Sequence, residues 1–212
     1  FASYGEGFRA PTLNELYSPG FGGLFAGNPD LEPERSRSTE LGVDWRAGAH
    51  DLALRAYRTR IRDLVDFSGG DTFQAINVKK AAIDGAELEW SWRVAERWTL
   101  GATGTYDRAR DEDTDVDLVR RPRRKLVARV SNDATDQLSW GVDAQYASER
   151  RDFDGRLAAY TVVAGWMDWR FATDWRAGLR LDNAFDRDYA LVSGYATPGR
   201  AFLVTLAWQP EP

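Results

Sequence analysis

The sequence predicts an all-β fold, an antiparallel β-barrel whose strands cross a membrane, from three observations. The mean hydropathy is -0.52, 29% of the residues are charged, and no apolar run approaches the roughly 18 residues that a spanning helix needs. Aromatic residues nevertheless make up 13% of the chain. A barrel strand reconciles these facts, because it alternates apolar residues facing lipid with polar residues facing the lumen.

The segment 98–107 shows this alternation most plainly. One face of the predicted strand carries Trp98, Leu100, Ala102, Gly104 and Tyr106. Aromatic rings at both ends of a strand of about ten residues match the two aromatic girdles of a membrane barrel. The same layout recurs over 138–146 and 202–208. A soluble β-sandwich has no reason to place its rings in this way.

Other strands follow from period-two patterns bounded by turn residues. They are predicted over 36–46, 51–65, 74–93, 122–132, 159–171 and 175–185. With an opening strand near Phe1, about ten strands result. That number would leave a large barrel open, with unsatisfied backbone groups in lipid. We therefore expect further strands, and the N-terminal part of the protein, to precede Phe1.

The connections between these strands fall into two alternating classes. Short turns are predicted at 47–50, 94–97, 132–136 and 172–174, and longer loops at 9–33, 67–73, 109–120, 148–157 and 186–197. Outer-membrane barrels have short periplasmic turns and longer extracellular loops. The longer loops are therefore expected to face outward.

Catalytic chemistry is not favoured. His50, the single histidine, lies in a predicted short turn without a nucleophile nearby and is interpreted as a solvated turn residue. Charges predicted to face the lumen are Glu87, Glu89, Asp107, Asp143, Arg180 and Asp182. Carboxylates two residues apart also arise from barrel alternation, so their default role is structural. An enzyme needs a nucleophile constellation that His50 cannot supply from a turn.

Two loops are candidates for ligand contact. The acidic run from Asp111 to Asp117 could wrap calcium or bridge divalent cations at the outer leaflet, but it lacks the Gly and terminal Glu of an EF-hand, and a solvated loop is favoured. The loop 9–33 is irregular around Phe21 to Pro29, and its apolar residues Leu13, Leu16, Tyr17 and Leu31 predict packing against another element. Ligand contact is a second hypothesis for that loop.

The charge and the cysteine content exclude further classes. A net charge of -5 argues against a nucleic-acid partner. The absence of cysteine removes thiolate metal sites, thiol nucleophiles and disulfides. No resident metal or cofactor is predicted, although calcium stays a candidate for the complete protein.

Four segments spread over most of the chain resemble the TonB-dependent receptors. They are YGEGFRAPTLNELY from Tyr4, GNPDLEPERS from Gly27, IDGAELEW from Ile83 and LDNAFDRDY from Leu181. The resemblance implies a multi-pass protein of the bacterial outer membrane, with a barrel of about 22 strands and an N-terminal plug. Residues 1–212 would then be the C-terminal portion of the barrel, with plug and earlier strands absent. Implied partners are the TonB complex, through the missing N-terminal region, outer-membrane lipid and lipopolysaccharide.

Within that family, three segments look most like cobalamin receptors. They are AINVKKAAIDGAELEW, LVRRPRRK from Leu118 and GYATPGR from Gly194. The resemblance implies energy-coupled cobalamin uptake and places Arg120 and Tyr195 near the corrinoid, where a guanidinium could meet amides or phosphate and a ring could cover an apolar edge. Rim anchoring is the alternative role for both residues. A ferric-siderophore receptor is the alternative function, and a passive porin-like channel is a third.

The C-terminal sequence departs from the family pattern. Members usually end on an aromatic residue that the barrel-assembly machinery reads, whereas Trp208 is followed here by Gln209, Pro210, Glu211 and Pro212. Pro210 also removes a ladder donor from the last strand. We therefore expect assembly to be affected.

Overall fold

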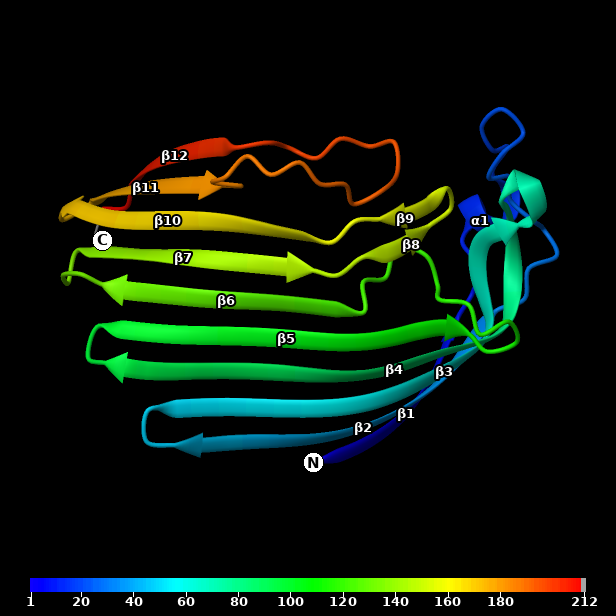
Figure 1. Ribbon diagram of the computed structural model, residues 1–212, viewed down its shortest axis with the longest axis horizontal. Coiled ribbons are helices and arrows are strands. Elements are labelled where there is room, and N and C mark those ends of the chain that lie inside the picture. Colours follow the sequence, from blue (N-terminus) through cyan, green and yellow to red (C-terminus); the bar gives the residue numbers. More distant parts are fainter. Residues whose placement is uncertain (211–212) are drawn as a thin grey trace. The chain divides into compact units, whose positions relative to one another are not determined.

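The computed structural model describes residues 1–210, and the side chains of all of these except Ser68, Gly69 and Lys79. Glu211 and Pro212, on which part of the C-terminal expectation rests, lie outside the described residues. Nearly all regular structure in that part of the chain is antiparallel β-strand (Figure 1). The predicted fold class is therefore confirmed.

The main sheet has ten strands among the described residues, and they follow one another in sequence order apart from one inserted hairpin. They are β1 (Ala2–Arg9), β2 (Glu34–Ala47), β3 (His50–Gly69), β4 (Gln74–Ala95), β5 (Trp98–Asp111), β6 (Arg124–Asp133), β7 (Leu138–Ala147), β10 (Tyr160–Ala172), β11 (Trp175–Asp182) and β12 (Ala201–Trp208). The edges of the sheet are β1 and β12. This up-and-down order arises when short turns and longer loops alternately connect each strand to the next.

The chain divides into two compact units. The first unit comprises Phe1–Gly42, Arg55–Ala86 and Asp107–Arg121, and the second comprises Val43–Leu54, Glu87–Tyr106 and Pro122–Pro212. All four predicted short turns belong to the second unit. Gly48, in the turn between β2 and β3, has a φ of +58°, a conformation that glycine adopts at little cost.

The longer loops contain structure that the strand pattern did not predict. The loop after β1 includes α1 (Leu13–Tyr17), and the loop after β7 includes the hairpin of β8 (Arg150–Asp152) and β9 (Gly155–Leu157). A one-turn 3-10 helix, η1 (Gly70–Thr72), joins β3 to β4. The strand predicted over 175–185 ends earlier, at Asp182. None of the helices in the described part of the chain has the length and apolar character to cross a bilayer.

His50 is not the solvated turn residue that the sequence predicts. It begins β3, is half-buried, and stacks on Trp92 with ring centroids 5.2 Å apart. Trp45 and Trp90 lie 6.5 Å and 6.2 Å from the same ring. Other ring contacts near the short turns join Trp98 to Trp140 and Trp175 to Trp208. These rings match the interfacial girdle expected at one end of barrel strands.

Candidate functional site

The loop 10–33 is fixed to the strand ends by one cation and two carboxylates, all in the first unit. Arg9 donates to Glu15 in α1 at 2.9 Å and to Glu34 at the start of β2. Glu34 also accepts from the backbone N–H of Val65 at 2.8 Å. Burial acts to raise the pKa of the Glu15 carboxyl, but hydrogen bonds from Arg9 and Thr12 outweigh it and hold that pKa below its ordinary value.

The same loop also packs on the β3–β4 hairpin. Asn77 accepts from the backbone N–H of Glu32 at 2.8 Å and donates to its carbonyl at 3.0 Å. The ring of Phe25 stacks on Phe73 at 5.3 Å. Leu31 is buried, as the packing hypothesis requires, whereas Leu13 is 77% exposed. Packing is therefore confirmed for the end of the loop but not for α1.

Arg120 lies in the loop between β5 and β6 of the first unit. The loop is held two residues earlier, where the backbone N–H of Leu118 donates to the carbonyl of Ala109 at 3.0 Å and the Leu118 side chain is buried. Arg120 itself is exposed, with a φ of +60°, and it also interacts with other groups of the chain. The backbone of this loop is thus held two residues before Arg120.

Tyr195 lies in the loop 183–200 of the second unit and is 73% exposed. It follows Gly194, whose φ is +78°, and its backbone N–H donates to the carbonyl of Val192 at 3.2 Å. Nearby, the hydroxyl of Thr197 donates to the carbonyl of Tyr189 at 2.6 Å. An exposed ring on a loop closed by its own hydrogen bonds can cover an apolar surface at little entropic cost.

Two buried residues that sequence reasoning missed hold the Tyr195 loop. Asp152 is 2% exposed and accepts from the backbone N–H of Ser193 at 2.7 Å. Arg150 is 5% exposed, donates to the carbonyl of Ala190, and lies 5.4 Å from the ring centroid of Tyr160. The β8–β9 hairpin therefore acts as the support of the loop 183–200.

The acidic run from Asp111 to Asp117 is engaged by the protein itself. Asp111 accepts from the backbone N–H groups of Asp113 and Thr114 at 2.8 Å and 3.0 Å. Asp115 pairs with Arg110 at 2.8 Å. Among the residues that the structure describes, no group of three or more histidine, cysteine or acidic side chains could hold a metal ion.

Several charges predicted to face the lumen have partners within the sheet. Asp107 accepts from the hydroxyl of Tyr57, and Asp143 pairs with Arg129. Arg180 and Asp182, two residues apart on β11, pair with each other at 2.9 Å. These contacts support the structural role predicted for the charges, because each pair ties side chains of the wall together.

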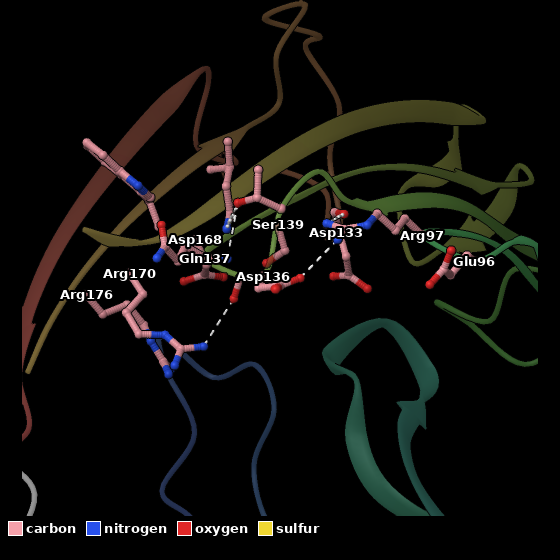
Figure 2. A pocket seen from close by; sticks show the side chains of 12 residues that line it. Glu96, Arg97, Asp133, Asp136, Gln137, Ser139, Asp168, Arg170 and Arg176 are labelled. Carbon is pink, nitrogen blue, oxygen red and sulfur yellow. Dashed lines mark hydrogen bonds and ion pairs between the residues drawn. The ribbon is translucent and has the colours of Figure 1, made fainter. Parts of the chain in front are cut away.

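A polar pocket lies among the short turns of the second unit (Figure 2). Figure 2 shows Asp136 between two arginines: its carboxylate pairs with Arg97 at 3.0 Å, and its carbonyl accepts from Arg170 at 3.3 Å. The pocket lies at the ends of β10 and β11 next to their short turn. The loop that carries Tyr195 leaves β11 at its other end, so this pocket is separate from the predicted contact at Tyr195.

The chain belongs to the TonB-dependent receptor family. The family model described as "TonB dependent receptor-like, beta-barrel" matches residues 1–184. Members are outer-membrane receptors and transporters rather than enzymes, and the ten-stranded antiparallel sheet with its alternating connections is the wall of such a barrel.

The chain spans about a third of the length of the known proteins described next. The curated relative "Vitamin B12 transporter BtuB" of Vibrio vulnificus (strain YJ016) is 31% identical over 224 aligned residues, which cover 98% of this chain and 34% of that protein. The solved copper transporter OprC is 20% identical, with a TM-score of 0.82, over 98% of this chain and 36% of OprC. The solved ferric enterobactin receptor PfeA is 21% identical, with a TM-score of 0.79, over 98% of this chain and 38% of PfeA. The two solved structures show the shared fold.

Proposed function

We propose that this chain is the C-terminal portion of the barrel of an outer-membrane receptor for energy-coupled uptake of cobalamin. The observation that carries the proposal is the 31% identity, over 98% of the chain, to a protein described as a vitamin B12 transporter. The chain spans about a third of that relative's length. The plug and the earlier strands are proposed to belong to the part of the receptor outside this sequence.

In this proposal the receptor makes and breaks no covalent bond. Cobalamin binds at the outer mouth, between the longer loops. Because it makes different contacts with the two conformations of the receptor, one for each position of the plug, its binding shifts the plug. The TonB complex then supplies energy through the N-terminal region. The apolar face of the strands lies in outer-membrane lipid and lipopolysaccharide.

Uptake measurements separate this receptor from a passive channel. Radiolabelled cyanocobalamin is offered to cells that carry the complete receptor, with and without a functional TonB complex. We expect saturable uptake that is lost without the complex. Uptake that is unsaturable and equal in both strains would identify a porin-like channel instead.

Arg120 and Tyr195 are proposed to contact the corrinoid from two different loops. Both side chains are exposed, and each lies on a loop anchored by a buried residue, Leu118 for one and Asp152 for the other. The guanidinium can donate to amide or phosphate oxygens, and the ring can cover an apolar edge.

Alanine substitutions in the complete receptor test these two contacts. Removing a charge-assisted hydrogen bond or an aromatic contact costs about 1–3 kcal/mol, so Arg120→Ala and Tyr195→Ala are each expected to weaken cyanocobalamin binding about 5- to 150-fold. Arg156→Ala, which removes an exposed arginine of β9 paired with Glu149, is the control and should bind normally. Unchanged affinity in both test variants would remove Arg120 and Tyr195 from the site.

A further inference from the structure

Three apolar side chains of the loop 10–33 are exposed at intervals of four residues. Leu13 and Tyr17, in α1, are 77% and 65% exposed, and they share one face of the helix because residues four apart are neighbours there. Phe21 follows α1 and is 87% exposed. We call these three residues the apolar set. An apolar surface that stays exposed on an ordered segment is typical of an interaction site.

Phe21 is presented on a tight turn. Its backbone N–H donates to the carbonyl of Leu24 at 2.8 Å, and the N–H of Leu24 donates back to the carbonyl of Phe21 at 3.0 Å. The two glycines between them have φ values of +58° and +83°, as a two-residue hairpin turn requires. The base of the turn is held to β4, where the N–H of Ala75 donates to the carbonyl of Ala26 at 3.0 Å. A side chain held in this way loses little entropy when it contacts another molecule.

The register of the strands shows which side of the wall this loop is tied to. Asp107 on β5, which is predicted to face the lumen, accepts from the hydroxyl of Tyr57 on β3. Thr59 lies two residues after Tyr57 and therefore on the same face. The hydroxyls of Thr59 and Ser38 lie 2.9 Å apart. Ser38 on β2 is thus on the side predicted to face the lumen.

Arg9, which holds α1, lies on that same side. Ser38 pairs with Gly5 on β1, and Arg9 pairs with Glu34. Both steps, from 5 to 9 and from 38 to 34, are of four residues, so they keep the same face of the sheet. Because Arg9 also pairs with Glu15 at 2.9 Å, α1 is tied to the lumen-facing side of the wall. The loop that carries the apolar set therefore begins at the mouth of the lumen.

The charges of this loop indicate the kind of surface that it can meet. Residues 10–33 include Glu15, Asp30 and Glu32 but neither lysine nor arginine. Glu15 is neutralised by Arg9, whereas Asp30 and Glu32 are exposed. An anionic group brought against the loop would meet like charge, which disfavours it. An uncharged apolar surface meets no such penalty.

We propose that the apolar set contacts an uncharged apolar surface of the cargo at the outer mouth. The inference rests on the proposed function and extends it, because it names the part of the cargo that the loop 10–33 meets. The rings of Tyr17 and Phe21 supply most of the contact area, since an aromatic side chain buries a large surface with few rotatable bonds.

Isothermal titration calorimetry of the complete receptor in detergent tests the proposal, with cyanocobalamin as the probe. Tyr17→Ser and Phe21→Ser each remove a ring and are expected to weaken binding roughly 5- to 30-fold. The heat-capacity change on binding, which is negative when apolar surface is buried, should become smaller in magnitude in both. Tyr17→Phe keeps the ring and should bind as the wild type does. The control Val94→Ser removes an exposed apolar residue beside the short turn between β4 and β5 and should also leave binding unchanged.

Two results would overturn this inference alone. One is wild-type affinity in both ring variants. The other is weaker binding with an unchanged heat-capacity change, which would give the rings a structural role in place of a contact. Absence of cyanocobalamin binding in the wild type would contradict the proposed function, and the inference with it.

Discussion

The carboxylate of Glu15 makes two contacts that hold the loop 10–33. It accepts from the backbone N–H of Thr12 at 2.7 Å and so completes the capping box of α1. It also pairs with Arg9 at the end of β1. The start of a five-residue helix, too short to be stable alone, is thus tied to the barrel wall through one side chain.

Acid is expected to loosen this loop only at low pH. The folded pKa of Glu15 lies below its ordinary value of 4.5, so its stabilising contribution is complete above the ordinary pKa and is lost as the pH falls through the lowered value. Hydrogen exchange of α1, corrected for intrinsic rates, should be equal at pH 7 and pH 5.5 and faster below about pH 4. Glu15→Gln should show a smaller acid effect. Loss of protection between pH 7 and pH 5.5 would contradict this assignment.

The contacts of Asp152 predict that its removal would loosen the loop that carries Tyr195. It accepts from the backbone N–H groups of Phe153 and Ser193 while almost fully buried. Asp152→Ala leaves these donors unpaired, which costs about 1–3 kcal/mol each when they stay buried. Hydrogen exchange over 186–200 should therefore accelerate, whereas the exposed Asp154→Asn should leave it unchanged. Normal protection of the Ser193 amide in Asp152→Ala would show that the hairpin does not hold the loop.

At the scale of the strands, Gly85 makes room for a contact that crosses β4. Tyr57 on β3 reaches over Gly85 to donate to Asp107 on β5. A Cβ atom at position 85 would collide with the Tyr57 ring and lie 2.6 Å from the Asp107 carboxylate. The glycine of the IDGAELEW segment therefore has a physical role in joining three strands.

Gly85→Ala is expected to destabilise the barrel by about 1–3 kcal/mol, because the added methyl group forces the Tyr57 ring from its place. Heat unfolding of the complete receptor in detergent measures the change. Gly101→Ala on β5, whose Cβ would meet no atom closer than 3.7 Å, is the matched control. Removal of the ring by Tyr57→Ala should make the methyl group at 85 nearly harmless. Equal unfolding temperatures for Gly85→Ala and the control would contradict the packing role.

The strands could be predicted because the two faces of each strand lie in different environments, and its residues alternate between apolar and polar accordingly. The predicted segment 138–146 differs from β7 by one residue, and all four short turns were located. Three-residue strands such as β8 and β9 are too short to show that alternation. The capping pair of Thr12 and Glu15 can be recognised in the sequence as the start of a helix. The irregular stretch around Phe21 led instead to the prediction of a loop without a helix.

The candidate site could be predicted only in part. Exposed loop residues such as Arg120 and Tyr195 can be proposed from a family resemblance, because exposure needs no knowledge of partners. The burial of Arg150 and Asp152 arises from contacts with residues about 40 positions later. Nothing in the local sequence indicates such long-range contacts. Two charged residues in a polar loop are predicted to be exposed to solvent.

At the scale of the whole molecule, the shared fold of the family has to be distinguished from the choice of cargo. The match to the TonB-dependent receptor family covers residues 1–184 and so includes both strands and loops. The solved copper transporter OprC and the solved ferric enterobactin receptor PfeA share this fold at 20–21% identity. We propose that specificity for the cargo resides in the longer loops, where Arg120 and Tyr195 lie.

Equilibrium binding of cyanocobalamin to the complete receptor in detergent, with a panel of ferric siderophores alongside, tests the proposed function most directly. Saturable corrinoid binding at one molecule per receptor, not displaced by the ferric chelates, is the predicted result. Saturable binding of a ferric siderophore without any corrinoid binding would contradict it and assign the receptor to iron uptake.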